Sequence, residues 1–282
     1  MQNNKFDFPI STTMLVDDKG KETGWRGIRN DDTGEVFRPF SAVYKVQPYA
    51  ELIDTSEKVI QSTGMPFTRS EFVTCGGARC HVRYNFPNMV KTLAKVGDVV
   101  GLRVNLQSSY DGSLRNLVGA GIEVLRCTNG AVSLDGAVDY NKKHSVQFDL
   151  DSLKQAIAKV INQFGSLNLK IYDEMADIAL TDDQGENLIK NIVAPGLLAS
   201  RQAEKIVALW RNGTKVSTPS RSIYGVYDAA TYHMTHEIEG TRFELANRMN
   251  NYVFNRLVKV TRNTSELNEL IVKRAGVDSV VV

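Results

Sequence analysis

The chain has 282 residues, a hydrophobic fraction of 42%, a charged fraction of 23% and a formal net charge of +2 at pH 7. This composition is typical of a soluble globular protein with a sizeable core in one or two closely packed domains. A net charge this small excludes a uniformly basic surface, so any surface for nucleic acid must be local. The start of the chain does not resemble a signal peptide, and no apolar run approaches the roughly 20 residues that span a bilayer. We therefore expect a cytoplasmic protein with no membrane partner.

The N-terminal part of the chain predicts an arm followed by a hairpin. Residues 1–24 contain few periodic apolar positions and are expected to form the arm. The Asn, Asp and Gly residues at 30–34 supply the positive φ angles that a tight turn needs, which predicts a hairpin. Alternation over 41–47 then predicts a strand. Apolar residues at helical spacing over 50–62 predict the one helix of a β-rich domain at 25–148.

Alternating residues beyond this helix predict an antiparallel sheet with one apolar and one polar face. Residues 80–86 and 99–107 alternate most clearly. The Asp111-Gly112 pair predicts a turn after the second of these strands. Shorter strands are expected over 113–118 and 122–125.

From about residue 148 the apolar period changes to nearly four, which indicates helices. Asp151 is expected to cap the first helix, and Thr181 with Gln184 has the spacing of a capping box. The tail at 263–282 ends in apolar residues that can form a short strand. Later helices are expected over about 167–180, 183–193, 199–212, 221–238 and 240–260, within a helical region at 149–262. The predicted fold class is α+β, with a twisted antiparallel sheet in the N-terminal half packed with a helical C-terminal half.

Two short segments favour a structural interpretation over a functional one. Gly76-Gly77 is not followed by the lysine of a phosphate-binding loop, so a bulge or turn is expected. Residues 126–130 are expected to form the corner after the last strand, where Asn129 or Gly130 can adopt the left-handed conformation.

The sequence makes no positive case for an enzyme. It contains no nucleophile elbow, Walker loop or dinucleotide fingerprint. Cys75 and Cys80 lack the second pair that a zinc site needs, so with Cys127 they favour reduced thiols. His233 and His236 can share a metal or lie on a polar helix face, and the second interpretation is favoured. We expect no catalytic residue, no metal and no cofactor.

The charge distribution is more informative, because residues 79–126 contain seven basic residues and three acidic ones, a local excess of +4. Strand parity places Arg83 and Arg103 on the polar sheet face, and Tyr110 is expected at the hairpin tip. Such a face suits a phosphate backbone with an occasional stacked base, although a solvated outer face also needs charges. The candidate nucleic-acid contacts are Arg79, Arg83, Lys91, Lys95, Arg103, Tyr110 and Arg115.

Ordered motifs connect these segments to a known family. The series runs from Gly97-Asp98 through Ser109-Tyr110-Asp111-Gly112-Ser113 to 124–130 (VLRCTNG), and it is preceded by 29–36 (RNDDTGEV) and 44–47 (YKVQ). Downstream, residues 224–236 (YGVYDAATYHMTH) continue it. Together these motifs resemble a phage/plasmid-like protein family catalogued only as a domain of unknown function, of the nine-three-two type. The resemblance spans about residues 26–240, with departures at Arg126-Cys127 and Asp228-Ala229.

The resemblance implies a phage or mobile-element origin but no established activity. The order of a twisted sheet followed by helices is also similar to single-strand annealing proteins of the Rad fifty-two, Redβ and RecT kind. Such proteins form rings or filaments, hold single-stranded DNA in a basic groove and need no nucleotide. This similarity implies a phage-encoded single-stranded DNA-binding and annealing protein, homo-oligomeric, acting in recombination or replication in the host cytoplasm.

Two alternatives stay open. The first is a non-enzymatic phage assembly or host-takeover protein that binds another protein, with residues 277–282 pairing with a neighbouring sheet edge. The second is a metal enzyme that uses His233 and His236.

Overall fold

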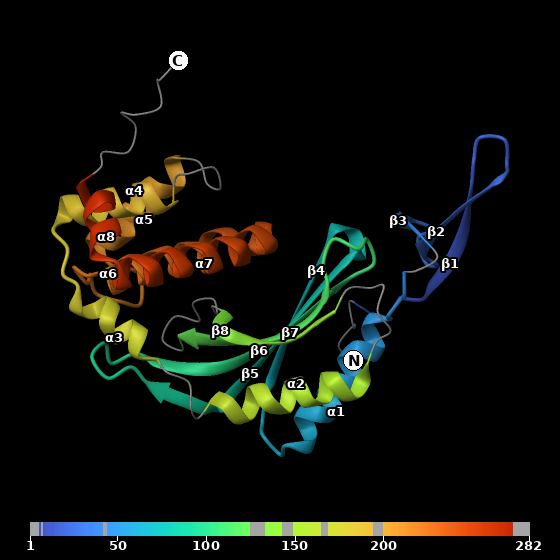
Figure 1. Cartoon of the computed structure of the whole chain (residues 1–282), viewed down its shortest axis with the longest axis horizontal. Coiled ribbons are helices and arrows are strands. Elements are labelled where there is room, and N and C mark those ends of the chain that lie inside the picture. The colour runs from blue at the N-terminus through green and yellow to red at the C-terminus, as the bar shows by residue number, and fades with distance from the viewer. Residues whose placement is uncertain are drawn as a thin grey trace. The chain divides into compact units, whose positions relative to one another are not determined.

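The computed structural model describes residues 6, 8–41, 44–124, 133–142, 149–164, 169–193 and 200–272. It confirms the α+β class, with antiparallel sheets in the N-terminal half and helices in the C-terminal half (Figure 1). No helix among these residues is long and apolar enough to cross a membrane. The chain divides into two compact units, the first comprising 1–89, 102–121 and 133–166 and the second comprising 90–101, 122–132 and 167–282.

A three-stranded antiparallel sheet begins the first unit. Its strands are β1 (Ile10–Val16), β2 (Glu22–Asn30) and β3 (Val36–Phe40), in the order β1-β2-β3. The Asn30 Oδ1 atom accepts hydrogen bonds from the backbone N–H groups of Asp32 and Thr33, which closes the predicted hairpin turn. The segment expected to be an arm therefore contributes a paired strand.

The strand predicted over residues 41–47 is wrong, since the described residues of that segment form none. The Tyr44 hydroxyl instead donates a hydrogen bond to the Ser109 carbonyl (2.8 Å), and Gln47 donates to Glu51. The alternation over this segment therefore does not reflect strand pairing. The helix that follows, α1 (Tyr49–Ser62), is confirmed to within one residue.

The second sheet has five strands in the order β4-β5-β6-β7-β8, all neighbours in sequence. Arg103 Nε donates to Asn85 Oδ1 (2.9 Å), which confirms that odd-numbered residues of β5 and β6 share one face. Helices α1 and α2 (Leu150–Gln163) contact each other and lie on one side of this sheet (Figure 1). The strands are β4 (Thr68–Thr74), β5 (Arg79–Thr92), β6 (Val99–Ser109), β7 (Asn116–Val124) and β8 (Ser133–Lys142).

The cap of α2 differs from the sequence prediction. Asp149, not Asp151, is the N-cap residue, and its carboxylate accepts hydrogen bonds from the N–H groups of Asp151 and Ser152. Both acids precede the apolar stripe, so sequence alone cannot tell which one occupies the cap. For α4 (Asp182–Val193), the predicted capping box is confirmed, since Thr181 and Gln184 exchange side-chain to backbone hydrogen bonds.

The second unit is built from helices around an aromatic core. Tyr172, Tyr224, Tyr227 and Phe254 pack with ring centroids 5.5–6.3 Å apart. Helix α8 lies in the region expected to be a tail. The bounds are α3 (Lys170–Asp177), α4 (Asp182–Val193), α5 (Ser200–Asn212), α6 (Ile223–His233), the π-helical turn η3 (Met234–Ile238), α7 (Glu239–Arg262) and α8 (Thr264–Val272). The predicted corner at 126–130 and tail strand at 277–282 lie outside the described residues.

Candidate nucleic-acid interface

The polar face of the five-stranded sheet is not the exposed basic surface that the sequence predicts. Arg83 and Arg103 are only 8% and 3% exposed, so the expectation of a solvent-facing position is wrong for both. The Arg83 guanidinium lies 4.9 Å above the Phe72 ring, and Arg103 binds Asn85. Strand parity gave the correct face for both residues, but parity carries no information about what covers that face.

Lys91 and Lys95 belong to the 90–101 hairpin, in the second unit. Lys91 is half-buried, whereas Lys95 is exposed and places its Nζ 2.6 Å from Asp177 Oδ1. The Lys95 backbone N–H donates to Asp173 (2.9 Å). The two Lys95 contacts attach the hairpin to helix α3, which gives this lysine a structural role that the sequence did not indicate.

The β6–β7 hairpin tip is organised by Asp111. Its Oδ1 accepts hydrogen bonds from the N–H and the hydroxyl of Ser113, and its Oδ2 lies 2.9 Å from Arg79 Nε. Burial raises the pKa of the Asp111 carboxyl, but the bonds from Ser113 and Arg79 outweigh it and hold the pKa below its usual value. The carboxylate therefore stays ionised and fixes the turn at neutral pH.

Two arginines from distant parts of the chain contact Asp111 at this tip. Arg79 pairs with the Asp111 side chain, and Arg38 Nη1 donates to the Asp111 carbonyl (3.3 Å). Arg115 is exposed four residues further along. We call Arg38, Arg79, Asp111 and Arg115 the hairpin-tip cluster. Its formal charge of three positive and one negative group makes it locally basic.

Tyr110 is not an exposed stacking residue, and that prediction is wrong. Its side chain is 3% exposed and stacks on Tyr49 with ring centroids 3.7 Å apart. Its hydroxyl accepts a hydrogen bond from the Tyr49 N–H (2.9 Å) in the first turn of α1, where backbone donors lack partners within the helix. Phe8 and Phe37 pack against the same ring at 6.1 and 5.6 Å. We call these four rings the aromatic junction.

The turn Cys75–Gly77 lies against the Phe8 and Phe37 rings of this junction. All three residues have positive φ angles of 53°, 65° and 102°, which confirms the turn predicted for Gly76-Gly77. A Cβ atom at Gly77 would lie 3.1 Å from the Phe8 ring. Glycine is therefore required at position 77 by both the backbone conformation and the packing.

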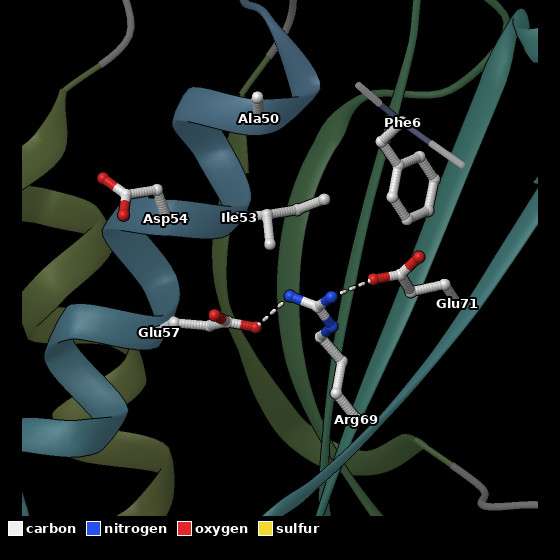
Figure 2. A pocket seen from close by; sticks show the side chains of 7 residues that line it. All are labelled: Phe6, Ala50, Ile53, Asp54, Glu57, Arg69 and Glu71. Atoms are coloured by element: carbon white, nitrogen blue, oxygen red, sulfur yellow. Dashed lines mark hydrogen bonds and ion pairs between the residues drawn. The ribbon is translucent and has the colours of Figure 1, made fainter. Parts of the chain in front are cut away.

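A pocket of about 230 Å³ lies between α1 and β4, and Figure 2 shows Arg69 held between Glu57 and Glu71. Arg69 Nη1 and Nη2 each lie 2.5 Å from a carboxylate oxygen. Burial alone lowers the pKa of the Arg69 guanidinium, yet the two glutamates outweigh it and raise the pKa above its usual value. No His, Ser or Cys is among the lining residues, which are Phe6, Ala50, Ile53, Asp54, Glu57, Arg69 and Glu71. This arrangement braces the helix against the sheet and offers no nucleophile with an adjacent base.

Replacing Arg69 with alanine is expected to lower the free energy of unfolding by about 1–3 kcal/mol. The change leaves the Glu57 and Glu71 carboxylates facing each other without the guanidinium that neutralises them. Urea unfolding followed by circular dichroism measures the loss. Lys58→Ala is the control, since its pair with Asp54 is 71% and 61% exposed and is expected to contribute little. Equal effects of the two changes would contradict the bracing role.

Within the described ranges no group of three or more His, Cys, Asp or Glu side chains is placed to hold a metal ion, at His233 and His236 or elsewhere. His233 is fully buried, and its ring nitrogens lie 2.6 Å from Gln202 Oε1 and 3.2 Å from Glu237 Oε2. His236 is exposed and packs on the Tyr232 ring at 4.4 Å. His233 is thus a core histidine with polar partners.

The stability of the protein is expected to fall as the pH drops below about 6.5. Burial lowers the pKa of His233, and Glu237 opposes this without cancelling it. Because the folded pKa is depressed, the unfolded chain binds the proton first, so the stability present above the unfolded pKa is lost towards lower pH. Thermal unfolding between pH 7 and 5 tests this. His233→Gln is expected to flatten the pH dependence, whereas His236→Gln keeps it; the reverse pattern would contradict the assignment.

Sequence reasoning missed Arg38, which lies outside the basic window at 79–126. It is 73 residues from Asp111 along the chain, and no spacing signal connects the two. It also missed Trp25, which is 50% exposed on β2. Of the seven predicted contacts, the structure brings Arg79 and Tyr110 to one place, since Arg79 pairs with Asp111 and the Tyr110 N–H donates to the Ala78 carbonyl; Arg115 follows them in the same hairpin.

A family model described as "Domain of unknown function (DUF932)" matches residues 37–273. No curated protein and no solved structure matches the chain.

Proposed function

The chain belongs to the DUF932 family, and we propose that it is a phage-encoded protein that binds and anneals single-stranded DNA as a homo-oligomer in recombination or replication. The hairpin-tip cluster is the observation that carries this function. Arg38 and Arg115 are exposed, and Arg38 and Arg79 both contact Asp111. Guanidinium groups recognise phosphate oxygens through paired hydrogen bonds, so this surface suits a nucleic-acid backbone.

Two of the motifs that resemble the family meet at the hairpin tip. Tyr44, from the motif at 44–47, donates a hydrogen bond to the Ser109 carbonyl in the hairpin motif. Their convergence on the hairpin tip supports a shared surface there.

Trp25 offers a flat surface for a base. It is 50% exposed, whereas Trp210 is 1% exposed. Stacking of bases on exposed aromatic side chains is the usual sequence-tolerant contact for single strands. Binding is therefore expected to quench the fluorescence of Trp25 while leaving that of Trp210 unchanged.

A salt titration of binding to fluorescent single-stranded and double-stranded oligonucleotides, with mass photometry on the same samples, tests the function. We expect salt-sensitive binding that prefers single strands, by a species larger than one chain. No binding at low salt, or equal binding to duplex, would contradict the proposed function. An annealing assay then separates annealing from binding.

A non-enzymatic assembly or host-takeover role is the second candidate. Exposed apolar side chains at Met14, Val16 and Trp25 favour a protein partner for the first sheet. Pairing of residues 277–282 with a sheet edge stays a prediction, since they lie outside the described residues. Deleting these six residues is expected to abolish oligomers if the tail has this role; intact oligomers would argue against it.

A further inference from the structure

The edges of the two sheets differ in how they are protected. An edge strand presents unpaired N–H and C=O groups, and proteins commonly guard such edges with charged residues or proline. The strand order makes β1, β3, β4 and β8 the edges among the described strands. Three of them follow the rule: β3 contains Arg38 and Pro39, β4 contains Arg69 and Glu71, and β8 contains Asp135, Asp139 and Lys142.

Strand β1 is the exception. Its seven residues, ISTTMLV, include no charged residue and no proline. Met14 and Val16 are 40% and 57% exposed on it. A long, uncharged edge with exposed apolar side chains is a template for another strand.

The hydrogen bonds between β1 and β2 show which backbone N–H and C=O groups of β1 face the edge. The Asp31 N–H donates to the Pro9 carbonyl (3.0 Å), at the end of the ladder between β1 and β2. Hydrogen-bonded and non-hydrogen-bonded pairs alternate in an antiparallel ladder. Ser11 and Thr13 therefore bond inward to β2. The backbone groups of Ile10, Thr12 and Met14 point to the open edge.

We propose that β1 pairs antiparallel with β1 of a second copy of this chain. A two-fold axis at Thr13 places that residue opposite itself. The same register pairs Thr12 with Met14, which brings edge-facing backbone groups together on both sides of the axis; the ladder between β1 and β2 is regular up to Met14. The strand is its own complement in this register, because it has no charge that would meet a like charge. The joined sheet has the order β3-β2-β1-β1-β2-β3.

This pairing deepens the oligomeric part of the proposed function and needs no nucleic acid. A foreign strand could use the same edge, but nothing on it selects a particular side chain or charge. Association measured without DNA therefore tests the interface separately from DNA binding.

Opposite charges at position 13 provide the test. In a two-fold pair, Thr13 faces its counterpart at a non-hydrogen-bonded position, where the Cα atoms are about 4.5 Å apart. Thr13→Lys and Thr13→Asp are each expected to weaken self-association at least tenfold, on the order of the penalty for facing like charges. An equal mixture of the two is expected to restore it. Sedimentation velocity of the full chain without DNA measures all three.

Thr68→Lys and Thr68→Asp are the matched controls, because Thr68 is an exposed threonine on the edge strand β4. They are expected to associate like the original protein. Three results would overturn the pairing: a monomeric original protein, unweakened association of both Thr13 variants, or loss of association that mixing does not restore. Single-strand binding by the same samples shows separately whether the proposed function holds.

Discussion

Replacing Tyr110 with alanine is expected to lower the free energy of unfolding of the first unit by about 3–5 kcal/mol, the range for truncating a buried aromatic side chain. The ring fills the aromatic junction, where it stacks on Tyr49 and contacts Phe8 and Phe37. The alanine variant loses these contacts and leaves a cavity between the hairpin tip and α1. Urea unfolding followed by far-ultraviolet circular dichroism measures the change in midpoint.

Tyr110→Phe separates the ring from its hydroxyl. This variant keeps the packing but leaves the Tyr49 N–H without its acceptor, so a loss of about 1–2 kcal/mol is expected. If Tyr110→Ala is no worse than Tyr110→Phe, the ring is not part of a packed core. An exposed stacking role for Tyr110 would then be open again.

The double substitution Arg38→Ala with Arg115→Ala is expected to weaken single-strand binding on the order of tenfold or more. A hydrogen bond to a charged group contributes about 1.5–3 kcal/mol, and about 1.4 kcal/mol corresponds to a factor of ten. The plot of log affinity against log salt is expected to become shallower by about 1.4, because each lost phosphate contact on a single strand removes about 0.7. Fluorescence anisotropy at several salt concentrations gives both values.

Lys58→Ala with Lys154→Ala is the matched control for charge. These lysines are 71% and 54% exposed on α1 and α2, so the variant loses the same two positive charges from the same unit. It is expected to keep most of the affinity and nearly the original salt slope. Equal losses in both double variants would show that net charge, and not the hairpin-tip cluster, determines binding.

The sequence predicted the fold class and most helices because these depend on local periodicity. Alternation in β5 and β6 also placed Arg83 and Arg103 on the correct face, as the Arg103–Asn85 bond confirms. The alternation did not predict that these two side chains are buried. Burial depends on other segments that pack over the strand, and alternation within the strand says nothing about them. The choice of Arg83 and Arg103 as phosphate contacts assumed an uncovered face, and both side chains are buried.

The contacts at the hairpin tip could not be predicted from the sequence, because they join residues that are far apart along the chain. Asp111-Gly112 predicted the turn correctly, but Tyr110 was assigned to the exposed tip because its partner Tyr49 lies 61 residues away in sequence. Arg38 was overlooked for the same reason. The described residues of 41–47 form no strand although the segment alternates, because alternation does not show whether another strand pairs with it; Tyr44 instead bonds Ser109. Contacts between distant segments therefore define this candidate site, and no local pattern reveals them.

Photocrosslinking tests the claim that the hairpin-tip cluster binds single-stranded DNA most directly. The full chain is irradiated with an oligonucleotide containing 4-thiothymidine, and the crosslinked peptides are mapped by mass spectrometry. We expect crosslinks at Trp25 and within residues 38–41, 44–47 and 109–116, and the loss of those in the last three ranges in the Arg38→Ala and Arg115→Ala double variant. Crosslinks confined to helices α3 to α8, or unchanged in that variant, would contradict the assignment.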